Sequence, residues 1–189
     1  MPLNATACGA FILLAFTLAG VAQTAWFASP MSRAFALPLD GGLRVRRRRI
    51  FGANKTIRGF VVMVPAAAAS FALLAAITPA STGLWNLSTG WFAALGAAAG
   101  FGFMAGELPN SFVKRQLDIV PGAAPFKRVS SAIQFLADRL DSGIGMLLAM
   151  TVLVPMPWQT WAVVLIIGPA IHWVFSVVMF QLGLKARPA

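Results

Sequence analysis

Negative charge is the scarcest feature of this 189-residue sequence, which contains only five Asp and Glu residues. Charged residues of both signs make up 11% of the chain, whereas soluble domains carry about 25%. No Asp, Glu, Lys or Arg occurs in three long stretches, residues 1–32, 59–106 and 142–184. Hydrophobic residues reach 59%, and the mean hydropathy is +0.79. These absences exclude a soluble globular protein and indicate an integral membrane protein.

Cysteine and tyrosine are also scarce, since the sequence has one cysteine, Cys8, and no tyrosine. A single thiol excludes an internal disulfide, and the sequence around Cys8 offers no metal ligands. No repeat and no low-complexity tail divides the chain. We therefore expect residues 1–189 to form a single membrane domain.

The lengths of the uncharged stretches predict the number of spans, because one helix needs about 20 apolar residues to cross a bilayer. The first stretch has room for one span, and each of the other two has room for two, with turns near Pro79 and Pro155. The sequence thus predicts an all-α integral membrane protein with five transmembrane helices. The expected spans are residues 9–28, 60–77, 90–106, 138–156 and 161–182. The expected loops on the charged side are residues 29–59 and 107–137.

The basic residues predict the orientation of these spans. If the five spans alternate in direction, all 15 Lys and Arg residues fall on one side, including Lys185 and Arg187 near the end of the chain. Basic loops stay in the cytoplasm, so we expect an outside N-terminus and two functional cytoplasmic loops. We expect a multi-pass protein of the cytoplasmic (inner) membrane. The first apolar run lacks a basic residue before it, which argues against a cleaved signal peptide.

Small residues recur at helical spacing in the third predicted span, as Gly96 with Gly100 and Gly102 with Gly106. Such G-x-x-x-G pairs allow close helix packing. We favour packing within one protomer, and a homodimer interface stays open as the alternative. The lone histidine, His172, is expected to be a packing residue rather than a catalyst.

The first charged loop contains two basic segments with different interpretations. For Arg44 and Arg46–Arg49 we favour topology and attraction to anionic lipid headgroups over a phosphate-binding surface. The stretch Gly52–Gly59 differs, because an ammonium, a hydroxyl and a guanidinium occur within four residues just before a span. Backbone N–H groups at a helix N-terminus also favour phosphate. We interpret this stretch as an anion-binding cradle.

Three carboxylates occur at the charged ends of the third and fourth predicted spans. Asp138 and Asp141 are three residues apart, so they share one helix face, and Glu107 ends the neighbouring span. One interpretation is a salt bridge to Arg139 or another basic residue. The other is a divalent cation, since Mg²⁺ is bound through carboxylates together with substrate phosphates. We favour the metal.

Three motifs in this order resemble those of the archaeal CDP-archaeol synthases, which are related to the CDP-diacylglycerol synthases. IFGANKTIRGF (residues 50–60) resembles their R-x-F-G-x-x-K-T-x-R-G stretch, and GELPNSFVKR (residues 106–115) resembles their G-D-L-x-K-S-F-I-K-R stretch. DRLDS (residues 138–142) is similar to the D-x-x-D element that both groups share, and Pro38 and Asp40 match a proline and an acidic residue ahead of the loop. The sequence differs in having Glu107 in place of Asp and Asn110 in place of a common Lys.

The resemblance implies an enzyme, a CTP:lipid-phosphate cytidylyltransferase that forms a CDP-lipid and releases pyrophosphate. Its expected partners are CTP, a lipid phosphate and membrane lipids, with no nucleic acid. The residues implied for catalysis are Lys55, Arg58, Lys114 and Arg115. Those implied for substrate binding are Asn54, Thr56, Asn110, Ser111 and Asp40. Those implied for binding Mg²⁺ are Glu107, Asp138 and Asp141.

Two other functional classes compete with the enzyme. A catalytically altered member of the family would act as a lipid-binding or partner subunit of a membrane complex. A small transporter would need ionisable groups near the middle of its spans, and only His172 meets that condition.

Overall fold

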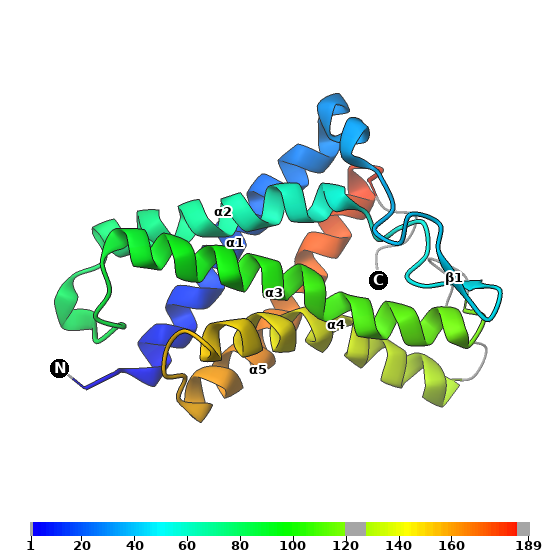
Figure 1. Cartoon of the computed structure of the whole chain (residues 1–189). Helices are drawn as coiled ribbons and strands as arrows, with labels where there is room; N and C mark the ends of the chain where they lie inside the picture. Colours follow the sequence, from blue (N-terminus) through cyan, green and yellow to red (C-terminus); the bar gives the residue numbers. More distant parts are fainter. Residues whose placement is uncertain (1, 120–127, 185–189) are drawn as a thin grey trace.

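The computed structural model describes residues 2–119 and 128–184, without the side chains of residues 128–133 and 135. Within these residues the chain forms five long α-helices (Figure 1). They are α1 (Ala5–Ala28), α2 (Ile57–Ile77), α3 (Thr89–Gln116), α4 (Arg128–Thr151) and α5 (Trp158–Gln181). Each overlaps one predicted span. Four of them, α1, α2, α3 and α5, are long and apolar enough to cross a membrane, and α4 carries more charge. The five-span count therefore stays a prediction.

The helices pack as a layer of three crossed by a pair. In Figure 1, α3 runs between α2 and α4, while α1 and α5 cross these helices. Helix α1 packs against α2 and α5, and α5 also contacts α4. The apolar core lies between these helices and contains the fully buried side chains of Ile12, Phe71 and Leu147.

The N-terminus and the two short interhelical connections meet at one end of the bundle. The Asn4 N–H donates to the Gly83 carbonyl at 2.8 Å, just after the 3₁₀ turn η2 (Ala80–Thr82). The Trp85 indole N–H donates to the Pro155 carbonyl at 2.9 Å. The first charged connection, the C-terminal end of α3 and the N-terminal end of α4 lie at the opposite end, so α1 to α5 alternate in direction, as the predicted topology requires.

Two helices extend beyond the predicted spans into the segment that we expected to be a loop, residues 107–137. Helix α3 continues to Gln116 even though Pro109 lies inside it, and α4 begins at Arg128. The physical reason is that charged residues end a membrane span without ending a helix, because the backbone hydrogen bonds of a helix are internal. Residues 120–127, which include Gly122 and two prolines, lie outside the described residues.

The glycine pairs of α3 pack within the protomer and face two different helices. A Cβ at Gly96 would lie 2.5 Å from the Ala67 carbonyl oxygen of α2, and one at Gly102 would lie 2.5 Å from the Gly145 carbonyl oxygen of α4. Gly106 likewise lies against the α4 backbone at Asp141. Close packing within one protomer, the favoured interpretation, is confirmed.

The first charged connection is more ordered than the all-α prediction allowed. It contains the 3₁₀ helix η1 (Pro30–Phe35) and an antiparallel hairpin of β1 (Arg44–Val45) and β2 (Arg48–Arg49). The hairpin forms because the connection is tied by a carboxylate at its centre, which local sequence patterns do not reveal. Figure 1 shows it beside the C-terminal end of α3.

Asp40 organises this connection. Its buried carboxylate accepts hydrogen bonds from the backbone N–H groups of Gly42, Phe51 and Gly52 at 3.0–3.1 Å and from the Arg49 guanidinium at 2.5 Å. Burial by itself would raise the pKa of Asp40, but Arg49 and the three N–H donors lower it well below its usual range. Asp40 is therefore ionised, and it holds the loop in one shape.

We predict that Gly102→Ala destabilises the protein, because the added methyl group meets the α4 backbone. Overpacking of this kind costs about 1–3 kcal/mol. The matched control is Gly168→Ala in α5, where the nearest atom to an added Cβ is a Leu13 methyl at 3.8 Å. The measurement is the midpoint of unfolding in detergent. Equal midpoints for the two variants would contradict the packing described here.

We also predict that Asp40→Asn loosens the first connection at neutral pH. Removing one partner of a buried ion pair costs about 3–5 kcal/mol. Because the pKa of Asp40 is lower in the folded state, its contribution is present at neutral pH and is lost only as the pH falls through the folded value. The measurement is the rate of tryptic cleavage between residues 44 and 49.

The control is Asp118→Asn, because the Asp118 side chain is 67% exposed in its ion pair with Arg48. Exposed pairs contribute about 0–1 kcal/mol. We expect Asp40→Asn to be cleaved at least ten times faster than this control. Similar rates would show that Asp40 does not organise the loop.

Candidate active site

A cavity of about 400 Å³ lies at the charged end of the bundle, between the first connection, α3 and α4. Ten of the twelve site residues predicted from the sequence line it, although they come from three separate segments. They are Asn54, Lys55, Thr56, Glu107, Asn110, Ser111, Lys114, Arg115, Asp138 and Asp141. The cavity is large enough for a small-molecule ligand, whose pockets typically measure about 300–1,000 Å³.

The other two predicted residues, Asp40 and Arg58, are not among the described residues that line this cavity. Asp40 faces the interior of its own loop. Arg58 donates to the Phe27 carbonyl at 2.5 Å, and its guanidinium lies 4.3 Å from the centre of the Phe27 ring. Since Phe27 itself lines the cavity, Arg58 supports the wall from behind.

Lys55 connects the first loop to α3. It forms an ion pair with Glu107, and the Ser142 hydroxyl of α4 donates to the other Glu107 oxygen at 2.9 Å. Burial would lower the pKa of Lys55, but Glu107 and the two aspartates beyond it raise the pKa above the ordinary lysine value. Lys55 is therefore a fixed positive charge in the cavity wall.

The two aspartates of α4 meet the side chain of Asn110 from α3. The Asn110 amide nitrogen donates to Asp138 at 2.6 Å and to Asp141 at 2.7 Å. Lys114 forms an ion pair with Asp138, and the Gln134 amide donates to Asp138 at 2.8 Å. Asp138 therefore forms the salt bridge that one interpretation expected, and its partner is Lys114.

The predicted trio of metal-binding carboxylates is arranged differently from the expectation. In residues 2–119 and 128–184, no three His, Cys, Asp or Glu side chains are grouped as a metal site. Glu107 points to Lys55 and Ser142, while Asp138 and Asp141 converge on one amide nitrogen. The Asn110 amide nitrogen occupies the point where the two carboxylates converge, and carboxylate oxygens are the ligands that a hard cation such as Mg²⁺ prefers.

The remaining polar residues of the cavity suit an anionic ligand. Lys114 faces the cavity beside the aspartates, and Asn54 and Thr56 lie on the first loop beside Lys55. Arg115 also lines the cavity and donates to the Ile119 carbonyl just after the end of α3. A site with several cations and a carboxylate pair can bind a phosphate chain together with a metal ion.

Sequence reasoning missed several residues of the site. Gln134 and Ser142 fix the orientation of the carboxylates, and Gln23 and His172 line the cavity from α1 and α5. One signal was present for Gln23 and His172. Each is a polar residue in the half of its apolar run nearest the charged end, but local sequence does not show which face such a residue presents.

Comparisons with known proteins agree with the motifs. The sequence model of the CarS-like CDP-archaeol synthase family matches residues 26–188. The chain is 32% identical over 160 residues to the CDP-archaeol synthase of Halobacterium salinarum, which covers 80% of this chain and 82% of the relative. It is 33% identical over 155 residues to the CDP-archaeol synthase of Methanopyrus kandleri, which covers 80% of this chain and 79% of the relative.

A solved structure described as an intramembrane enzyme for archaeal membrane lipids biosynthesis has a similar fold. Its TM-score is 0.58 and its sequence identity is 27%, over 87% of this chain and 90% of that chain. The resemblance inferred from the three motifs is thereby confirmed. A match to nearly the whole chain, with relatives above 30% identity, shows that this protein belongs to the CDP-archaeol synthase family.

Proposed function

We propose that this protein is a CTP-dependent cytidylyltransferase that converts a membrane lipid phosphate into a CDP-lipid. An oxygen of the lipid phosphate attacks the α-phosphorus of CTP, a new P–O bond forms, and the bond to the β-phosphate breaks to release pyrophosphate. The reaction takes place at the cytoplasmic face of the inner membrane, where the basic connections are expected to lie. The names of the relatives, all CDP-archaeol synthases, support this reaction class.

The observation that carries the proposal is the composition of the cavity at the charged end of the bundle. Cations from the first loop and α3, together with two aspartates of α4, line a space large enough for a nucleotide. Phosphoryl and nucleotidyl transfer need charge neutralisation and in-line positioning more than covalent help from the protein. The contacts support such a role, because Lys55, Lys114 and the two aspartates are each held by a hydrogen bond or ion pair from another element.

The roles of individual residues follow from their contacts. Lys55 of the first loop and Lys114 of α3 neutralise phosphate oxygens, and Arg115 adds charge beside Lys114. Asn54, Thr56 and Ser111 donate hydrogen bonds to the nucleotide. Arg58 and Asp40 act without touching the substrate. Arg58 supports Phe27 in the cavity wall, and Asp40 fixes the loop that carries Lys55.

Asp138 and Asp141 are proposed to hold Mg²⁺, with Asn110 beside them. When bound, the metal would neutralise charge on the triphosphate and orient it. Glu107 contributes by holding Lys55 through an ion pair and Ser142 through a hydrogen bond. The altered Glu107 and Asn110 are the only support for the rival function, a catalytically altered lipid-binding or partner subunit.

We predict CTP-dependent release of pyrophosphate by the purified protein in detergent with Mg²⁺ and a panel of diether and diacyl lipid phosphates. Asp141→Asn should lower kcat at least 100-fold, because it removes one of the two converging carboxylates. Asp118→Asn, the same exchange at a residue outside the cavity, should retain the activity of the wild type. Loss of activity in both variants would show that the effect is not specific to the cavity.

The same assay separates the rival functions. Turnover with one lipid class identifies the substrate and supports the enzyme. Binding of CTP and Mg²⁺ without turnover on any lipid would favour a substrate outside the panel. Absence of nucleotide binding would overturn the proposal and favour the lipid-binding or partner subunit.

We predict that the metal site can be measured without turnover. Mn²⁺, a spectroscopic substitute for Mg²⁺, should bind the wild type, and Asp138→Asn with Asp141→Asn should weaken binding at least tenfold. The readout is the electron paramagnetic resonance signal of free Mn²⁺ in the presence of CTP. Asp118→Asn is again the control. Unchanged Mn²⁺ affinity in the double variant would contradict the proposed ligands.

A further inference from the structure

The turn of the β1–β2 hairpin carries positive charge that no described carboxylate neutralises. Three exposed residues, Arg44, Arg46 and Arg47, form what we call the arginine tip. In the part of the chain that the structure describes there are four ion pairs, and none of them includes an arginine of the tip. The tip therefore offers three guanidinium groups to an anion from outside the protein.

Two arginines of the tip are in a backbone conformation that arginine rarely adopts. Arg46 and Arg47 lie between the paired residues Val45 and Arg48, with positive φ angles of 50° and 67°. A two-residue turn of this kind usually contains Asn-Gly, because a positive φ strains other side chains. Strained residues cluster at functional sites. Local stability does not account for two arginines at this turn.

The base of the hairpin is fastened beside the nucleotide cavity. Arg48 donates to the Gln116 carbonyl at the end of α3 and pairs with Asp118. Lys114, two residues before Gln116, lines the cavity, and so does Phe51, three residues after Arg48. Figure 1 shows the hairpin beside this end of α3. The arginine tip is therefore held close to the residues that line the cavity.

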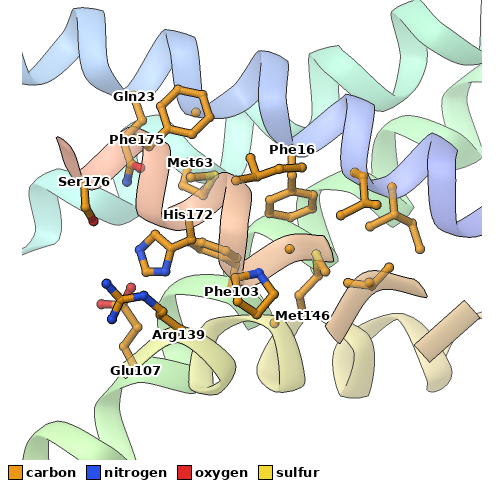
Figure 2. Close-up of a pocket in the computed structure, with 18 of the residues that line it drawn as sticks. Phe16, Gln23, Met63, Phe103, Glu107, Arg139, Met146, His172, Phe175 and Ser176 are labelled. Atoms are coloured by element: carbon orange, nitrogen blue, oxygen red, sulfur yellow. The ribbon is translucent and has the colours of Figure 1, made fainter. Parts of the chain in front are cut away.

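The opposite side of the nucleotide cavity is unsuited to the entry of a polyanion. A second cavity, of about 120 Å³, adjoins the first at Glu107 and His172 and runs into the bundle toward Phe103 and Met146 (Figure 2). Its inner walls are hydrocarbon, aromatic and thioether, and moving phosphate charge from water into such surroundings is very unfavourable. CTP therefore approaches from the charged end of the bundle, where the hairpin lies.

The hairpin also lies beyond the expected layer of lipid headgroups. Helix α3 continues from Gly106, the expected end of its span, to Gln116, which adds about 15 Å at 1.5 Å per residue. The polar layer on each side of the hydrocarbon core is only about 5–8 Å thick. Because Arg48 joins the hairpin to Gln116, soluble anions are within reach of the tip. This placement favours a phosphate-binding surface over attraction to headgroups.

We infer that the arginine tip captures the triphosphate of CTP from solution and guides it into the cavity. The inference rests on the proposed function and adds a capture step to it. Guanidinium groups pair well with phosphate. Positive charge beside a cleft raises the association rates of anions by about 10–1,000-fold, and this effect falls with ionic strength. Because the tip lies outside the cavity lining, it acts on association and leaves the bound nucleotide to Lys55 and Lys114.

The test is the association rate of a fluorescent, ribose-labelled CTP with Mg²⁺, measured by stopped flow in a nonionic detergent. The double variant R46N/R47G removes two charges and supplies the residues that this turn prefers, so the hairpin should stay folded. We expect its association rate to fall at least threefold at 0.01 M salt, where charges act over about 30 Å. At 1 M salt, where they act over about 3 Å, the rate should match the wild type. The dissociation rate should stay unchanged.

The matched control is R46K/R47K, because it keeps both charges at the same turn. Its association rate should equal that of the wild type at both salt concentrations. Labelled CMP is a second control, since R46N/R47G should slow a monophosphate less than a triphosphate. Equal rates for R46N/R47G and the wild type at 0.01 M salt would overturn the inference. A loss shared by R46K/R47K would also overturn it, because the charge would then not be the cause.

The outcomes separate this inference from the proposed function. A wild type that binds no CTP would overturn both. CTP binding by the wild type, with an unchanged association rate in R46N/R47G, would overturn the inference alone. If that unchanged rate came with less phosphatidylglycerol copurifying with R46N/R47G, the arginines would serve the headgroups instead.

Discussion

The site depends on the close contact between α3 and α4. Gly102 and Gly106 of α3 meet Gly145 of α4 backbone to backbone, without a side chain between them. Helices normally pack with their axes about 8–10 Å apart. A larger spacing between α3 and α4 would pull apart the polar side chains that bond across this contact. The 2.7 Å hydrogen bond from Asn110 to Asp141 and the Ser142–Glu107 bond both cross this interface. The glycines thus position polar side chains one and two turns away.

The scarcity of acidic residues becomes intelligible once their partners are known. In the described part of the chain, ion pairs hold four of the five carboxylates. One of these pairs ties the first loop to Glu107 of α3, and another ties it to Asp118 just after α3. Asp141 instead accepts hydrogen bonds from neutral donors, Asn110 and Ser142. With a net charge of +10, the chain retains a surplus of cations that favours anionic ligands. A nucleoside triphosphate and a lipid phosphate are both of this kind.

Much of this arrangement could be predicted from the sequence, because membrane helices are encoded by long uncharged runs. The five helices and ten of the residues that line the cavity were predicted from such runs and from three motifs. The extension of α3 beyond Gly106 was not predicted, because a charged residue ends a membrane span but does not end a helix. The role of Asp40 was also out of reach, because its partners Arg49 and Gly52 meet it only after the loop closes. Gln134 and His172 were missed because their contacts come from other helices.

The contacts of Glu107 explain how a glutamate can stand where the family motif has an aspartate. Glutamate is one methylene longer than aspartate, and its two oxygens reach Lys55 of the first loop and Ser142 of α4. It therefore links three segments at the junction of the two cavities. A carboxylate used in this way leaves Asp138 and Asp141 as the pair available to a cation. Under the proposed function, the exchange at this position therefore leaves the two aspartates for the cation, and this supports the proposal of an active enzyme.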